Sequence, residues 1–483
     1  MILGSILVFK YRILFVYPFH QLQILAIGTN AYIGATKAYL LMDISLTRVL
    51  ICLVAGIALI VLLTAKWRIH AFFALAIACF LMGLGVGMPL SGVLTSIKDG
   101  FGNILKSLGF IIVLGTTLGV ILEHTGATRV MANTILKSIG EKRSALAMSI
   151  TGFIVGLPIF CDSGYIVLSG LNKSLARTTG ISLVIMATSL ATGLYAVHCL
   201  IPPHPGVAAA AGIIGVDYGK LILTGIGVAI PAMAAGYLWA NYAGKKLPVI
   251  VAGEEVLIEK NTQLPSPFKA FLPVVVPIIL IGIKAFLVVE QTPVNPFINI
   301  LTALGDPIIA LAIGVLLAFN CLRSFSKETI GKLLQEGAEK AGGILVIIGA
   351  GGAFGAVLAS TKIGDHLSAA LPLASMGIFF PFLITFVLKT AQGSSTVAII
   401  TAASIVLPLL PALGLDNEKG HLLCVLAMGA GSMMISHAND AYFWVIAKFS
   451  GLEMNTMLKV YSVATVCMGI VSFVIVYLLS FIL

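Results

Sequence analysis

Long apolar stretches recur along this chain, and they restrict its fold more than any other feature. A helix that crosses a membrane needs about 20 mainly apolar residues, and runs of that kind occur from residues 49–64 to residues 460–483. Hydrophobic residues make up 59% of the 483 residues and charged ones only 10%, which is outside the range of ordinary soluble domains. The sequence therefore predicts an all-α, polytopic membrane protein.

The charged residues indicate how the chain meets its surroundings. The formal net charge of +10 comes from Lys and Arg residues that lie mostly in short segments between apolar runs. They form no arm or stripe of the kind that binds nucleic acid, so we expect membrane lipid and no nucleic acid as a partner. Cytoplasmic loops of membrane proteins carry an excess of Lys and Arg, and this bias explains the charge.

The chain resembles itself at one fixed spacing. Residues 110–122 (FIIVLGTTLGVIL) align with residues 346–358 (VIIGAGGAFGAVL), and the same spacing, 346 − 110 = 236, places 190–193 on 426–429. Repeated segments at one spacing indicate a duplicated half. We expect five crossings in the first half, at residues 49–64, 71–88, 104–122, 181–216 and 221–240. Residues 148–171 contain Pro158 and four glycines, and we expect a re-entrant hairpin there.

An odd number of crossings makes the second half an inverted copy of the first. Lys173 and Arg177 fall on the same side as the other basic loops only if residues 148–171 turn back. The predicted organisation is a first inverted repeat at residues 42–240, a cytoplasmic linker at 241–272 and a second inverted repeat at 273–483. Residues 1–41 form an extension of doubtful function, because Met42 is a possible start.

The tip of the first hairpin is the first of four breaks in apolar segments, GLPIFCDSG at residues 156–164. Asp162 lies in it, and an ionisable group at membrane depth is a functional candidate. The alternative is a cap for a half-helix that begins at Ser163. We keep both roles open for Asp162.

The second break is IPPHPG, residues 201–206, inside the fourth crossing. Its three prolines lack amide donors and end the helix, and Gly206 opens a second half-helix whose free N–H groups favour an anion. His204 stands where it can bind a carboxylate or carry a proton. His198 is a weaker candidate of the same kind.

The third and fourth breaks lie in the second half. KTAQGSST, residues 389–396, places four small or polar residues at the start of a half-helix, which favours contact with a ligand over a simple cap. SHAND, residues 436–440, puts four polar groups into one crossing, with Asp440 as a second candidate for carrying a proton. The alternative for SHAND is a set of polar groups that satisfy one another.

Three strings together carry a resemblance to a known family. PPHPGVAAA (202–210), KTAQGSSTVA (389–398) and SHANDAYFW (436–444) make the chain similar to the GntP-type gluconate permeases, and the hydropathy agrees over residues 46–483. The resemblance implies a homodimeric carrier in the bacterial inner membrane that imports gluconate or a related sugar acid with a proton and needs no cofactor. It also implies inverted repeats in which hairpins and broken helices move as one unit.

The hairpin tip PIFCDSGY, residues 158–165, is more polar than the same part of the gluconate carriers in that family. A smaller hydroxy acid such as glycerate, or a D-amino acid such as D-serine, therefore stays open as the substrate, and Na⁺ stays open in place of H⁺. Expected proton carriers are Asp162, His204 and Asp440. The residues expected to contact substrate come from all four breaks: Ser163, His204, Gly206, Gly393, Ser394, Ser395, Thr396, Ser436 and Asn439.

Two other classes of protein compete with this interpretation. A membrane-embedded metalloenzyme could use the His and Asp residues as ligands, but His198 and His204 lack a zinc-site spacing and no HExxH motif occurs. We therefore expect no enzyme and no bound metal. A channel would use the same apolar helices without accumulating its substrate against a gradient.

Overall fold

The computed structural model describes residues 46–247, 264–289, 296–323, 326–361, 373–438 and 440–482. Over these residues the chain is helical and contains no strand. The extension at residues 1–41 and half of the predicted linker, residues 248–263, lie outside the described residues. The helices that flank the linker extend into the predicted range 241–272, because one ends at Gly244 and the next begins at Pro267.

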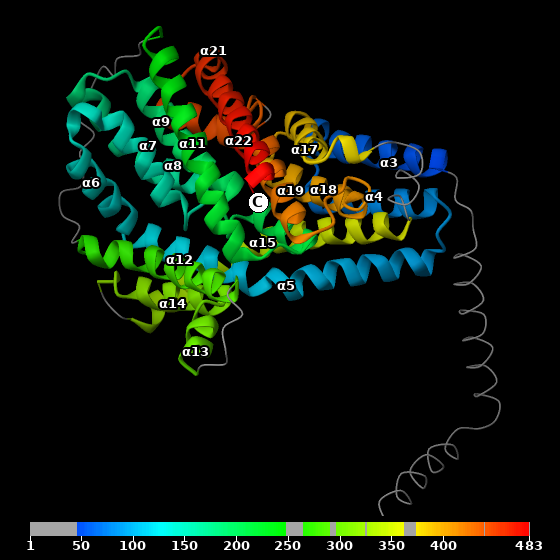
Figure 1. Ribbon diagram of the computed structural model, residues 1–483. Coiled ribbons are helices and arrows are strands. Elements are labelled where there is room, and N and C mark those ends of the chain that lie inside the picture. The colour runs from blue at the N-terminus through cyan, green and yellow to red at the C-terminus, as the bar shows by residue number, and fades with distance from the viewer. Residues whose placement is uncertain are drawn as a thin grey trace, which may run out of the picture.

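The first half contains the elements up to Gly244. In chain order they are α3 (Leu46–Val61), η1 (Leu62–Lys66), α4 (Ala71–Gly85), α5 (Leu90–His124), α6 (Ala127–Ile139), η2 (Glu141–Arg143), α7 (Ser144–Gly156), α8 (Cys161–Thr179), α9 (Leu183–Leu200), α10 (Pro205–Ile214) and α11 (Tyr218–Gly244). Figure 1 shows α5 as the long helix along the base of the molecule, with α6 to α9 at one end of it.

The second half contains the elements from Pro267 onward. They are α12 (Pro267–Val289), α13 (Pro296–Leu304), α14 (Pro307–Phe319), α15 (Lys327–Ser360), η3 (Leu373–Ser375), α17 (Phe379–Gln392), α18 (Ser395–Val406), η4 (Leu407–Leu409), α19 (Glu418–Met433), α20 (Ala441–Ser450), α21 (Met454–Met457), η5 (Leu458–Ser462) and α22 (Val463–Ile482).

The helix bounds repeat along the chain. Adding 236 to the bounds of α5, α7 and α11 gives 326–360, 380–392 and 454–480, against 327–360 for α15, 379–392 for α17 and 454–482 for the run from α21 to α22. The spacing found in the sequence is therefore also the spacing of the helices. The opposite orientation of the two halves in the membrane stays a prediction.

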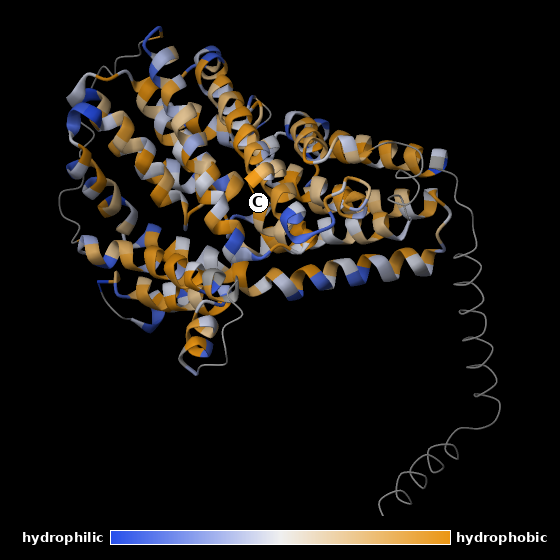
Figure 2. Cartoon of the chain, viewed as in Figure 1, coloured by the Kyte–Doolittle hydropathy of each residue, from blue (hydrophilic) through white to orange (hydrophobic). Residues whose placement is uncertain are grey.

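The helices are suited to a membrane. Among the described residues, seven helices are long and apolar enough to cross one, and the pair α13 and α14, bent by 69°, makes an eighth if it counts as a single span. Helix α4, where the sequence predicted a crossing, is a shorter apolar helix. Figure 2 shows hydrophobic residues along most helices and hydrophilic ones gathered mainly at helix ends and connections. The prediction of an all-α polytopic membrane protein is confirmed.

The predicted hairpin at residues 148–171 and the one predicted around the third break, at residues 378–410, are pairs of helices that meet at short irregular tips. Residues 157–160 separate α7 from α8, and Pro158 lies in this tip. In the second pair, Gly393 ends α17 with a φ of +82°, a conformation that costs glycine little, and Ser394 caps α18 by accepting a hydrogen bond from the amide of Val397. The chain thus stops one half-helix and starts the next within a few residues.

The hairpins and the broken helices pack on each other both within and across the halves. Within a half, α7 packs on α9 and α17 packs on α19; across the halves, α8 packs on α20 and α10 packs on α18. A methyl group added at Gly193 of α9 would lie 2.1 Å from the carbonyl oxygen of Ser149 in α7, so only glycine permits this approach. The four breaks are therefore held together in the interior of the protein.

Candidate functional site

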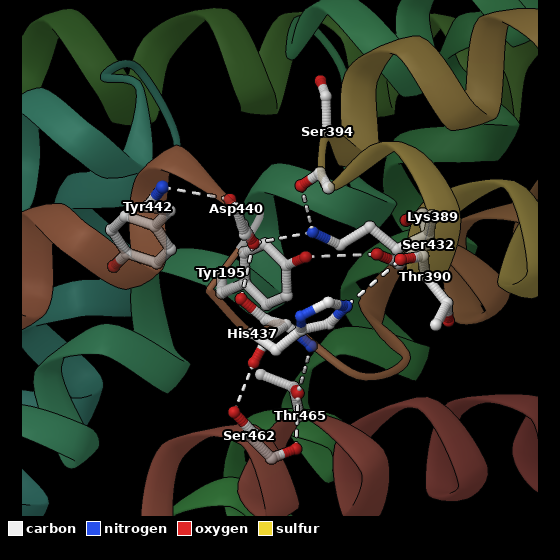
Figure 3. Close-up of polar contacts among 12 residues, drawn as sticks. Tyr195, Lys389, Thr390, Ser394, Ser432, His437, Asp440, Tyr442, Ser462 and Thr465 are labelled. Carbon is white, nitrogen blue, oxygen red and sulfur yellow. Dashed lines mark hydrogen bonds and ion pairs between the residues drawn. The ribbon is translucent and has the colours of Figure 1, made fainter. Parts of the chain in front are cut away.

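A buried ion pair lies where the second hairpin meets the second broken helix. The Nζ atom of Lys389, in the last turn of α17, is 2.6 Å from Oδ2 of Asp440, which precedes α20 (Figure 3). The two side chains are 0% and 8% exposed, so the pair is closed off from the surroundings. Charges at such depth are costly unless they are paired and hydrogen-bonded, and both conditions hold here.

Further hydrogen bonds complete the pair. Lys389 also donates to the carbonyl oxygen of Gly393 at the hairpin tip, at 2.5 Å. Ser436 donates its hydroxyl to Oδ2 of Asp440 at 2.5 Å, and Oδ1 of Asp440 accepts from the amide of Tyr442 at 3.0 Å. Asp440 therefore caps α20 and binds Lys389 at the same time. Within SHAND, the described contacts therefore join Ser436 to Asp440, and Lys389 adds the opposite charge from outside it.

The irregular backbone ahead of Asp440 is satisfied by hydroxyl groups of the last span. The amide of Ser436 donates to Oγ1 of Thr465 at 3.1 Å, and the hydroxyl of Ser462 donates to the carbonyl of Ser436. Ile435 has a φ of +44°, which is strained for a β-branched residue. Protein groups thus replace the water that is absent at this depth.

The first broken helix makes the corresponding contact without charge. His204 precedes α10, and its Nε2 atom forms a hydrogen bond with the carbonyl of Gly156, the last residue of α7, at 2.7 Å. The ring of His198 lies 5.1 Å from that of His204 and stacks on Tyr195. Both histidines are therefore close together.

Asp162 lies near the ion pair and, unlike the pair, has a buried carboxylate oxygen without a hydrogen-bond partner. It sits in the first turn of α8, and it interacts electrostatically with Asp440 and Lys389. Its Oδ1 atom is buried without a hydrogen-bond partner. The prediction that Asp162 caps a half-helix starting at Ser163 is wrong: α8 begins at Cys161, its cap position is Phe160, and no side chain caps it. One of the two carboxylate oxygens of Asp162 is thus left without a partner.

Gln392 gives a second sign of an unfilled site. Both amide atoms of its side chain are buried without a hydrogen-bond partner, and so is Nδ1 of His198. Buried polar atoms are normally paired, so each exception needs a reason such as a ligand or a water molecule. Gln392 ends α17 at the hairpin tip that carries Lys389, and His198 lies in α9 of the first broken helix.

Several predicted substrate contacts serve the packing of the tips. Ser395 is the buried first residue of α18. A methyl group added at Gly206 would lie 3.1 Å from Cα of Thr396, so these two residues hold α10 against α18. Three other predicted contacts lie beside Lys389 or among the hydrogen bonds of the ion pair described above: Gly393, Ser394 and Ser436. Asn439 lies outside the described residues.

Ser163 faces another region than the ion pair does. It lines a small cavity with Glu123 of α5 and Lys340 of α15. Glu123 also lines a larger cavity of about 520 Å³ beyond the end of α5, where Arg129 and Arg323 are found. The structure therefore does not place Ser163 among the residues that surround Lys389.

Lys389, Gln392, Ser462 and Thr465 were not among the predicted site residues. A signal for Lys389 was present, since an ionisable residue next to the apolar run 379–388 is a functional candidate by itself. The hydroxyl groups of Ser462 and Thr465 carry no such signal, because single Ser and Thr residues are ordinary in spanning helices. Among the described residues, no three His, Cys, Asp or Glu side chains are placed to hold a metal ion.

The arrangement provides a fixed cation, a carboxylate with one unpaired oxygen and the unpaired side-chain amide of Gln392. Such a site can bind a small organic anion through its charge and hydrogen bonds, and it can take up a proton.

Comparison with known proteins agrees with this chemistry. A profile described as GntP family permease matches residues 48–482. A gluconate permease of Pseudomonas aeruginosa is 36% identical over 458 residues, which cover 92% of this chain and 98% of that protein. A D-serine transporter of Escherichia coli K12 is 32% identical over 439 residues, which cover 89% and 98%.

One solved structure shares the fold. The YdaH transporter of Alcanivorax borkumensis, whose crystal structure reveals an unusual topology, superposes with a TM-score of 0.58 at 14% identity, over 85% of this chain and 97% of that one. Together with the spanning helices and an inner membrane permease of Escherichia coli among the relatives, these matches make the protein a multi-pass transporter of the inner membrane. The chain belongs to the GntP family of permeases.

Proposed function

We propose that the protein imports a monovalent sugar acid, with gluconate as the first candidate, together with one proton that Asp162 takes up. The observation that carries this proposal is the contrast between Asp162 and the ion pair. Lys389 and Asp440 neutralise each other, whereas Asp162 has a buried oxygen without a partner. A charged carboxylate in that state is costly to bury, and protonation removes the charge.

The charges of the site explain why proton and substrate travel together. With Asp162 ionised, the site holds one positive and two negative side chains, and it repels an anion. When Asp162 is protonated, the side-chain charges cancel and an anion can enter. Each ligand therefore favours the other, which is the thermodynamic requirement for coupling. The site that holds both a proton and an anion then carries the same net charge as the empty site. We therefore expect import to move no net charge across the membrane.

Asp440 and His204 are weaker candidates for the proton. Asp440 already accepts from Lys389, Ser436 and the amide of Tyr442. The Nε2 atom of His204 is bound to the carbonyl of Gly156. A change of protonation at either residue would break contacts that close the site, whereas a proton on Asp162 breaks none of the described ones.

The choice of gluconate rests on the relatives. Several are named as gluconate permeases or transporters, and one of them is 36% identical over nearly its whole length. A sugar acid offers one carboxylate for Lys389 and several hydroxyl groups for unpaired amides such as that of Gln392. The experiment is uptake of labelled gluconate into proteoliposomes under an inward proton gradient. Accumulation that a protonophore abolishes is expected; no accumulation under either a proton or a sodium gradient would reject the proposal.

Asp162→Asn tests the role of the carboxylate. The amide cannot take up a proton, so gradient-driven accumulation should fall about five- to 150-fold, the range of coupling between linked ligands. Exchange of labelled for unlabelled gluconate, which needs no net proton movement, should persist. Asp416→Asn is the matched control, because Asp416 is an exposed carboxylate in a loop away from the site. Equal losses in the two variants would remove Asp162 from the mechanism.

D-serine is the second candidate substrate, because one relative is a D-serine transporter and because Asp162 could bind its ammonium group. Competition of unlabelled D-serine and glycerate against labelled gluconate separates the candidates. If D-serine is the substrate, it competes best, and Asp162→Asn abolishes exchange as well as accumulation.

The two halves and the mode of movement belong to the same proposal. The contacts of α7 with α9 and of α10 with α18 favour movement of both hairpins and both broken helices as one unit. The proposal includes inverted repeats at residues 42–240 and 273–483 and a homodimer. The mass of the purified protein in detergent measures the homodimer directly.

A further inference from the structure

Two oxygen atoms bind the ammonium group of Lys389, and a hydroxyl group binds one of them; we call these three oxygen atoms the cage. The described partners of the ammonium group are a carboxylate oxygen of Asp440 at 2.6 Å and the carbonyl oxygen of Gly393, and Ser436 donates its hydroxyl to the same carboxylate oxygen. Carboxylate, carbonyl and hydroxyl oxygens are also the ligands that hard metal cations prefer. The cage would suit a sodium ion if the lysine were not there.

The ammonium group has bonding capacity left over. It carries three N–H donors, and the described residues accept two of them. Gly393 lies at the turn between α17 and α18, and the unpaired amide of the neighbouring Gln392 is buried at the same turn. An anion bound at this tip would therefore find one N–H of a fixed cation and the donors of an amide.

A purely structural role explains this pair poorly. Buried ion pairs can often be replaced by apolar residues of similar size without loss of stability, so a carrier does not need one to hold two helices together. Ionisable residues at membrane depth are usually retained for function. The pair also lies at the hairpin tip and the broken helix, where irregular backbone is expected around a ligand.

We propose that Lys389 is the built-in cation of the transport site. Its ammonium group binds the carboxylate of the substrate, Asp440 holds it in place as a permanent counter-charge, and the cage accordingly has no need of Na⁺. The ammonium group of Lys389 is covalently attached to the protein, and it takes the role that a bound sodium ion has in a sodium-driven carrier. The inference rests on the proposed transport of an organic anion, but it holds for gluconate and D-serine alike because both have a carboxylate.

Exchange of labelled for unlabelled gluconate in proteoliposomes tests the proposal at equal pH on both sides. Wild-type exchange should be the same in sodium as in choline buffer. Lys389→Met keeps most of the length of the side chain without its charge and should lose exchange. Lys389→Ala leaves a space for the three carbons and one nitrogen that it lacks, so propylammonium should restore exchange about tenfold or more, within the range of coupled ligands.

1-Propanol is the matched control, because it has nearly the same size as propylammonium and carries no charge. Recovery with propylammonium but not with propanol supports the proposal. The proposal is overturned if wild-type exchange stops without Na⁺, if Lys389→Met exchanges at the wild-type rate, or if Lys389→Ala responds equally to both compounds.

Single variants that leave Asp440 unpaired could fail to fold, and a double variant covers that case. Lys389→Met with Asp440→Asn removes both charges and should keep a melting temperature near that of the wild type while losing exchange. Wild-type exchange in the double variant would overturn the proposal. If the double variant melts far below the wild type, the pair is structural and the proposal also fails.

The failure of the proposed function can be told apart from the failure of this inference. Loss of proton-driven accumulation with intact exchange rejects the proton coupling alone. If gluconate is not exchanged at all, melting temperatures replace exchange as the readout: a ligand that binds the folded protein stabilises it. Propylammonium should then raise the melting temperature of Lys389→Ala and not that of the wild type, and equal shifts in both would overturn the inference.

Discussion

The two broken helices solve the same problem with different chemistry. His204 and Asp440 are 440 − 204 = 236 residues apart, and each precedes the second half-helix of its half. Each side chain bonds the end of the first hairpin helix in its own half, His204 at Gly156 and Asp440 at Lys389. One contact is an uncharged hydrogen bond and the other is an ion pair. The geometry is thus shared, while the paired charge is confined to the second half.

The backbone of the two breaks differs in a related way. The first break contains Pro202, Pro203 and Pro205, which have no N–H group to satisfy. The second break contains no proline, and its Ser436 takes partners from Ser462 and Thr465. A broken helix at membrane depth therefore either lacks backbone N–H donors or receives acceptors for them from neighbouring side chains. The first half of this chain uses the first solution, and the second half uses the second.

Asp440→Ala should break the comparison most severely. It leaves the ammonium group of Lys389 buried and unpaired, which costs about 3–5 kcal/mol of stability in known cases. We expect a large fall in the melting temperature in detergent and no transport. Asp416→Ala, in an exposed loop, is the control. A melting temperature near the wild type would show that Lys389 finds another partner.

His204→Ala should have a smaller effect. It removes a hydrogen bond to the buried carbonyl of Gly156, and leaving that acceptor unsatisfied costs about 1–3 kcal/mol. The melting temperature should fall less than in Asp440→Ala. An equal or larger fall would mean that the uncharged break holds its half as firmly as the ion pair does, and the contrast between the halves would disappear.

Gly193→Ala and Gly429→Ala should sharpen the comparison by showing what the halves share. The two glycines are 429 − 193 = 236 residues apart, and a methyl group would lie 2.1 Å and 2.6 Å from the carbonyl oxygens of Ser149 and Cys199. Overpacking of this kind costs about 1–3 kcal/mol, so both variants should melt at similarly lowered temperatures. Gly170→Ala is the control, because no atom lies within 4 Å of its added methyl group. A much smaller cost at one glycine would mean that the helix contact there, α9 on α7 for Gly193 or α19 on α9 for Gly429, is the looser one.

Thr465→Val should give the smallest change. It removes the hydroxyl acceptor of the Ser436 amide, which is worth about 0.5–1.5 kcal/mol. Thr224→Val is matched to it, since that hydroxyl only donates to carbonyls of its own helix turn. If the two variants melt at the same temperature, the hydroxyl groups of the last span do not support the second break.

Sequence patterns predicted the breaks better than the contacts between them. Prolines, glycines and polar residues inside apolar runs located both hairpins and both broken helices, because such residues interrupt helices by themselves. The pairing of Lys389 with Asp440 joins residues 51 positions apart, and no periodicity encodes it. The capping alternative for Asp162 was wrong because helix α8 begins two residues earlier than Ser163. Which helix ends face one another depends on packing across both halves.

The ion pair has a consequence for how this family can change over time. A buried charge without its counter-charge is costly, so neither Lys389 nor Asp440 can be lost alone without a second substitution nearby. The two positions are expected to covary among homologous carriers, with both charges present or both replaced. A sequence that keeps only the carboxylate would then identify a lineage in which a diffusible cation has taken over the place of the lysine.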